Sequence, residues 1–77
     1  MKAQITKVDS QKSQKTGKIV HMVCFKCEDG KSRNSWVDEG YRNYQRWSGL
    51  LKEGVELDNL IAKNDKMIDA DSYPKVI

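Results

Sequence analysis

The sequence predicts a small all-β domain with a single helix, and three observations lead to this prediction. Residues 18–38 contain two runs rich in β-branched and aromatic residues, separated by an Asp-Gly pair. Residues 39–52 carry apolar residues at helical spacing, and residues 55–71 return to short apolar runs. With 77 residues, the chain has the length of one domain, so we expect a single domain over residues 1–77.

The first strand is expected at residues 3–9, where Ile5 and Val8 are the apolar anchors. The following segment, residues 10–17, has no apolar residue and no acid, which is typical of an exposed loop. Lys12 and Lys15 lie in this loop, and Lys18 follows it directly. The loop is therefore basic.

Residues 19–25 and 31–37 are expected to form a hairpin around Asp29 and Gly30, a pair that tolerates the positive φ of a two-residue turn. Counting outward from such a turn pairs Val23 with Trp36. Side chains alternate along a strand, so one face carries Val23, Phe25, Asn34 and Trp36. The opposite face carries Met22, Cys24, Lys26, Arg33, Ser35 and Val37. The sequence leaves open which face is the core and which meets a ligand.

A helix is expected within residues 39–52, with Asp38 as its capping residue. Its apolar stripe consists of Tyr41, Tyr44, Trp47 and Leu51, at spacings of three, three and four. Such a stripe usually packs on a core, although aromatic residues can also form a stacking platform. We expect core packing.

The fourth and fifth strands are expected at residues 55–63 and 67–71. Residues 64–66 form the turn between them. Pro74 should end the fifth strand, because proline cannot donate a hydrogen bond to a neighbouring strand.

The charges are unevenly distributed. The net charge is +3, but residues 1–33 hold eight Lys or Arg against three acids, whereas residues 34–77 hold six against eight. Such asymmetry indicates either a surface that faces a polyanion or an ordinary solvated basic surface. No apolar run is long enough to span a bilayer, and the amino terminus lacks the apolar segment of a signal peptide. We expect a cytoplasmic protein without membrane contact.

The chain offers little for catalysis or metal binding. His21 is the only histidine and lies in an apolar strand, where we expect it to be packed and hydrogen-bonded. Cys24 and Cys27, three apart on a strand, should point to opposite faces, so we predict neither bound zinc nor a disulfide. Asp69 and Asp71 have no third ligand nearby, which favours solvated or turn-forming carboxylates. We therefore predict no enzyme activity, no metal site and no cofactor.

The order of these elements resembles the OB-fold, a five-stranded barrel with one helix between its third and fourth strands. An SH3-like barrel is the nearest alternative. The chain also looks like small phage or mobile-element proteins that bind single-stranded nucleic acid. In the OB pattern the ligand lies across strands two and three, between the first loop and the loop joining strands four and five.

This resemblance implies a nucleic-acid site made of basic and aromatic residues. The implied residues are Lys12, Lys15, Lys18, Phe25, Lys26, Lys31, Arg33, Trp36, Lys63 and Lys66. The lysines and the arginine would neutralise phosphates, and Phe25 and Trp36 would stack bases if their face points outward. The function expected from this site is non-catalytic binding of single-stranded DNA or RNA with little sequence preference. The alternative is a protein-interaction module that uses a strand edge or the apolar hairpin face.

Overall fold

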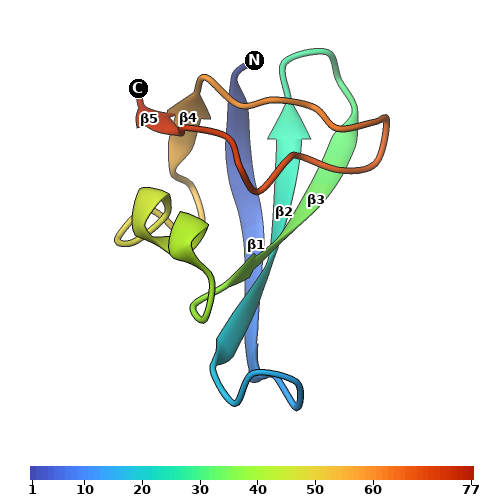
Figure 1. The fold of residues 1–77 in the computed structure, drawn as a ribbon. Helices are drawn as coiled ribbons and strands as arrows, with labels where there is room; N and C mark the ends of the chain where they lie inside the picture. Colours follow the sequence, from blue (N-terminus) through green and yellow to red (C-terminus); the bar gives the residue numbers. More distant parts are fainter.

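The computed structural model describes all 77 residues and contains one antiparallel sheet in the order β3-β2-β1-β4-β5 (Figure 1). The strands are β1 (Ala3–Lys12), β2 (Ile19–Cys27), β3 (Ser32–Asp38), β4 (Glu56–Asp58) and β5 (Lys75–Val76). The predicted all-β class is confirmed. The sheet is open and does not close into a barrel, and no α-helix is present. No helix has the length and hydropathy that a membrane crossing requires.

The first three strands are the long ones, and they form the tall part of the molecule (Figure 1). The predicted first strand was too short, because Ser10, Gln11 and Lys12 continue the pairing with β2. Backbone pairing does not require apolar side chains, so a polar segment can extend a hairpin when its partner strand is long. The connecting loop is thereby reduced to residues 13–18.

The predicted register of the β2–β3 hairpin was wrong by one residue. Val23 lies opposite Ser35, and Trp36 lies opposite Met22. The turn is a three-residue loop, residues 28–30, in which the Gly30 N–H donates to the Cys27 carbonyl at 2.9 Å. Gly30 has φ of 87°, as in the common three-residue loop that ends on a left-handed glycine. A shift of one residue exchanges the two faces of β3.

The predicted helix at residues 39–52 is replaced by a short 3₁₀ helix, η1 (Arg42–Arg46), and turns. Tyr44 N–H donates to the Tyr41 carbonyl, and Trp47 N–H to the Tyr44 carbonyl, both three residues back. The spacing of three between these aromatic residues suits a 3₁₀ helix, in which residues i and i+3 lie above one another. Asp38 does not cap an α-helix. Its carboxylate accepts the Gly40 N–H at 2.7 Å and holds a turn.

The carboxyl-terminal strands are shorter than predicted and partly displaced. The predicted strand at 55–63 stops at Asp58, because Asn59 adopts a positive φ of 64°. The predicted strand at 67–71 is reduced to isolated bridges, a parallel one from Met67 to Asn34 and an antiparallel one from Ile68 to Ala62. β5 instead follows Pro74 and pairs with β4. The proline fits there because β5 is an edge strand.

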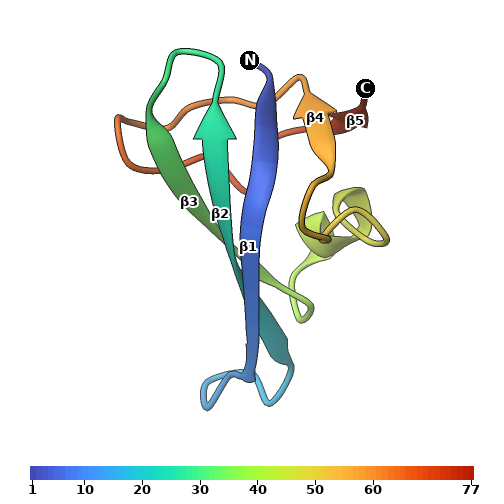
Figure 2. The ribbon, with the colours of Figure 1, turned by 180° about the vertical axis from the view of Figure 1, so that it is seen from behind.

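The core lies between the upper half of the sheet and the segments that cross it. Residues 59–74 cross one face of β1, β2 and β3, and η1 lies to the side of β1, below β4 (Figures 1 and 2). The buried apolar side chains are Ala3, Ile5, Val23, Phe25, Cys27, Val37, Trp47, Leu57, Leu60 and Ile68. Phe25 and Trp47 meet at its centre, with ring centroids 6.3 Å apart. The core role predicted for Trp47 is confirmed.

Candidate functional site

The outer face of the β2–β3 hairpin, turned away from the core, carries the most prominent exposed aromatic side chain of the sheet. Trp36 is 49% exposed, whereas Phe25 is 1% exposed. Because of the observed register, the two rings lie on opposite faces of the sheet. The prediction that Phe25 and Trp36 share a face was therefore wrong, and Phe25 is part of the core rather than of a ligand surface.

A groove of about 610 Å³ begins at Trp36 and runs between β3, η1 and residues 67–71. We call it the Trp36 groove. Its lining residues are Ser35, Trp36, Tyr41, Arg42, Asn43, Arg46, Lys63, Met67, Ile68, Asp69, Ala70 and Asp71. Trp36 also borders a smaller hollow of about 360 Å³ over β1 and β2. The indole thus separates two concave surfaces.

The wall of the groove opposite β3 is held in place by contacts between residues 43–47 and residues 70–73. The buried Trp47 donates its indole N–H to the Ala70 carbonyl at 2.8 Å. Arg46 donates to the Asp71 carbonyl at 2.8 Å, and its guanidinium lies 3.9 Å from the centre of the Tyr73 ring. Contacts within the protein therefore fix the position of this wall.

Some aromatic and cationic side chains at the groove form no hydrogen bond or salt bridge within the molecule. Tyr41 is 55% exposed at the start of η1. Arg42 and Lys63 are exposed, and the side chains of neither form a salt bridge or hydrogen bond within the molecule. The α-helix expected at residues 39–52 placed Tyr41 in the core and gave Arg42 no site, because its exposed face differs from that of η1. Lys63 was predicted as a phosphate-binding residue beside the last loop, and it lines the groove; its binding role stays a prediction.

Arg33 is not available for a phosphate. Its guanidinium, 5% exposed, donates to both carboxylate oxygens of Asp29, at 3.1 and 3.0 Å, and its Nε donates to the Asn64 carbonyl at 2.9 Å. The hydrogen bond from Arg33, followed by that from the Lys31 N–H, holds the pKa of Asp29 below its ordinary value. Arg33 is thus a structural link between the hairpin loop and residues 64–66, and its predicted role was wrong.

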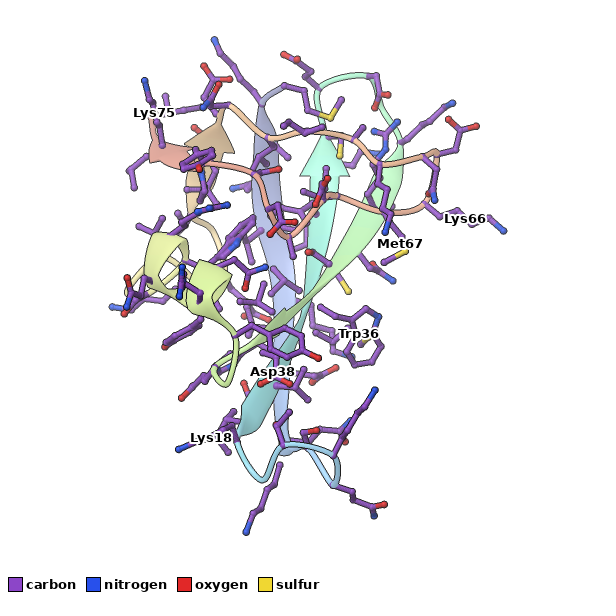
Figure 3. All side chains as sticks on the ribbon, in the orientation of Figure 1. Lys18, Trp36, Asp38, Lys66, Met67 and Lys75 are labelled. Carbon is purple, nitrogen blue, oxygen red and sulfur yellow. The ribbon has the colours of Figure 1, made fainter.

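The remaining predicted lysines divide into two groups. Lys12, Lys15 and Lys18 lie at the end of the long β1–β2 hairpin. Around the opposite end lie Lys26, which donates to the Gly30 carbonyl, Lys31, paired with Asp65 at 3.0 Å, and the exposed Lys66. Figure 3 shows Trp36 between Lys18 and Lys66. The structure therefore does not gather the lysines at one point, but places them at both ends of the molecule.

His21 and the cysteines agree with their predicted roles in packing. His21 Nδ1 lies 2.6 Å from the Ser10 hydroxyl, and its Nε2 lies 2.7 Å from the Glu39 carboxylate. The imidazole also stacks on Tyr44, with centroids 5.9 Å apart. Cys27 is buried in the core, while Cys24, on the other face of β2, is partly exposed, and both are free. That the cysteines bind no zinc stays a prediction, which native mass spectrometry of chelator-free protein can check.

Comparison of the chain with models of protein families, with curated proteins and with solved structures finds no match. The Trp36 groove is therefore the feature of the molecule that bears on function.

Proposed function

We propose that the protein binds single-stranded DNA or RNA without catalysis, with Trp36 as the stacking platform at the mouth of the Trp36 groove. The observation that carries this proposal is the half-exposed Trp36 beside a preformed groove that also holds Tyr41, Arg42 and Lys63. Aromatic rings next to cations are the combination that single strands require, because bases stack while phosphates are neutralised.

The charge distribution supports a strand that runs along the molecule. Lysines lie at both ends of the long axis, with Trp36 between them (Figure 3). Arg42 and Lys63 offer two unpaired cations inside the groove. Each phosphate contact on a single strand contributes a slope of about −0.7 to log affinity against log salt. Two groove contacts therefore give a slope of about −1.4, and the terminal lysines make it steeper.

The strand order is compatible with an OB-like arrangement, in which the ligand lies on the outer side of strands two and three. Two features support this comparison. β1 pairs with both β2 and β4, and Met67 makes a parallel bridge with Asn34 at the outer edge of β3, an edge that a closed barrel would also cover. Trp36 is on the outer face of β3, where the OB pattern expects a ligand.

A protein-interaction module is the second candidate, and an open strand edge favours it. β1 pairs with β4 only at Ala3 and Gln4, so the edge of β1 beyond the Val55 and Gly54 contacts of Ile5 has no neighbouring strand. An exposed edge can accept a strand of another protein. However, this edge carries the charged residues Lys7, Asp9 and Lys12. Charged side chains disfavour strand pairing at an edge, so this candidate ranks second.

The test is a fluorescence-anisotropy titration of labelled single-stranded DNA at two salt concentrations. Trp36→Ala should weaken binding by roughly 1–3 kcal/mol through lost stacking. Arg42→Ala should flatten the salt slope by about 0.7. Lys75→Ala is the matched control, because Lys75 is an exposed cation on the other side of the molecule (Figure 3) and should have the smallest effect. If the folded wild-type protein binds no single strand at low salt, the proposal is wrong and the protein-interaction module is the better account.

A further inference from the structure

The outer face of the sheet continues beyond Trp36 as a row of side chains across three strands. Trp36 of β3 lies opposite Met22 of β2, and Met22 lies opposite Asp9 of β1. Residues directly opposite each other in antiparallel strands project to the same face, so these three side chains share the outer face. Residues 59–74 cross the other face of the sheet, and no segment lies over this one (Figure 2). The row is therefore open to a ligand.

The smaller hollow beside Trp36 lies over this row. Its volume is about 360 Å³, and its lining residues are Asp9, Ser10, Gln11, Met22 and Trp36. Small-molecule sites in proteins span about 300–1,000 Å³, so the hollow has room for one planar ring. Trp36 lines both the hollow and the Trp36 groove. One indole therefore borders two concave surfaces that a ligand can occupy together.

The lining of the hollow suits a neutral ring better than a phosphate. None of the five lining residues is a cation, and Asp9 contributes a carboxylate. Lys7 lies 3.4 Å from that carboxylate, and the pair brings no net positive charge to the hollow. The apolar surface comes from the indole and from Met22, whose thioether makes favourable contacts with aromatic rings. The carboxamide of Gln11 can both donate to and accept from the edge of such a ring.

Resting on the proposed function, we infer that the hollow is a second base seat, so that a single strand places successive bases on the two sides of Trp36. One base stacks at the Trp36 groove, and its neighbour occupies the hollow against Met22. Arg42 and Lys63 line the groove alone, so the phosphate contacts belong to the groove side. Because the Gln11 carboxamide offers both a donor and an acceptor, the second seat accepts any of the four bases.

The three methionines of the chain report on the two seats separately. Met22 lines the hollow, Met67 lines the groove, and Met1 lines neither. The test is a titration of methyl-¹³C-methionine-labelled protein with oligo-dT, followed by ¹H–¹³C methyl spectra. A base that packs on a methyl group moves its signal through the ring current. We expect the Met22 and Met67 signals to move and the Met1 signal to stay in place.

Truncation of Met22 measures the second seat by affinity. Met22→Ala should weaken oligo-dT binding about fivefold, the lower end of the loss for one stacked base. Cys24→Ala is the matched control, because Cys24 is the next residue on the same face of β2 and lines neither the hollow nor the groove. Its affinity should stay close to that of the wild type. Thermal melts confirm that both variants are folded, and the methyl titration of the wild-type chain tests the inference even if Met22→Ala does not fold.

The outcomes separate this inference from the proposed function. Movement of the Met67 signal with an unmoved Met22 signal overturns the second seat and leaves binding at the groove intact. Movement of the Met22 signal alone overturns the placement of bases on both sides of Trp36. Unmoved signals at a saturating excess of oligo-dT overturn the inference and the proposed function together. Equal affinities of wild type and folded Met22→Ala protein also overturn the second seat.

Discussion

Residues 3–38 and residues 39–77 are built in different ways. The first half consists of three long strands joined by two hairpins, and its order comes from backbone ladders. The second half has a short 3₁₀ helix and strands of three and two residues. Scattered backbone bonds hold it together with individual side-chain hydrogen bonds, such as Trp47 to the Ala70 carbonyl and Asn59 to the Tyr73 carbonyl. The Trp36 groove lies where the two halves meet, with a ladder on one side and pinned loops on the other.

This difference implies that the second half depends on a few residues, while the first depends on its pattern. Substitution of one pinning side chain should therefore be costly in residues 39–77. An exposed strand position in residues 3–38 should tolerate the same kind of change.

The two tryptophans give the largest expected difference. Trp47 is fully buried against Phe25, so Trp47→Ala should lower the free energy of unfolding by roughly 3–5 kcal/mol. Trp36 is half-exposed on the outer face, so Trp36→Ala should change it by about 0.5 kcal/mol or less. Urea unfolding of both variants measures this. A larger loss of unfolding free energy for Trp36→Ala than for Trp47→Ala would contradict the observed register.

The contrast extends to a single hydroxyl. Ser72 is fully buried, and its Oγ accepts the Ile61 N–H at 2.9 Å. Ser72→Ala leaves that N–H without its partner and should cost roughly 1–3 kcal/mol. Ser32→Ala, at an exposed position in β3, is the matched control and should stay within about 0.5 kcal/mol. Thermal melts compare the two, and equal losses would mean that the second half is not pinned in this way.

The smallest expected effect concerns the Asp29–Arg33 pair, which holds the guanidinium that reaches across to the Asn64 carbonyl of the second half. The pKa of Asp29 is lower in the folded protein than its ordinary 3.8, so its contribution to stability is present above that pH. The contribution is lost as the pH falls through the folded-state pKa. Asp29→Asn should therefore flatten the acid side of the stability–pH profile below about pH 4. Asp65→Asn, which removes an exposed carboxylate paired with Lys31, should leave the profile closer to wild type. Parallel acid profiles of wild type and Asp29→Asn would argue against the pair.

The sequence predicted the first half well because its signals are local. Alternating apolar residues and an Asp-Gly turn indicated the β2–β3 hairpin, which the structure confirms. The register failed because a two-residue and a three-residue loop are both compatible with that turn. The one-residue difference in loop length places Trp36 on the outer face and leaves Phe25 in the core. The sequence therefore identified Trp36 as a candidate site residue, but it did not identify the residues that share its face.

The second half was less predictable because non-local contacts decide it. A spacing of three fits both α and 3₁₀ helices, and the choice depends on how Trp47 reaches Ala70. Asn59 interrupts the expected fourth strand while its side chain binds the Tyr73 carbonyl. No local pattern indicated that Asn43 would contact Asp71 across 28 positions. For this reason the groove wall was missing from the sequence-based site.

The central claim is that a single strand binds at Trp36, and the two indole N–H groups report on it directly. A titration with single-stranded DNA, followed by ¹⁵N–¹H spectra, resolves both indole signals. Because Trp36 is exposed at the groove and the Trp47 N–H is bonded to the Ala70 carbonyl, the Trp36 signal should shift most. The Arg42 and Asn43 amides should follow it, and those of Lys75 and Val76 should stay in place. Unchanged spectra at a saturating excess of DNA, or shifts confined to the edge of β1 or to β5, would contradict the account.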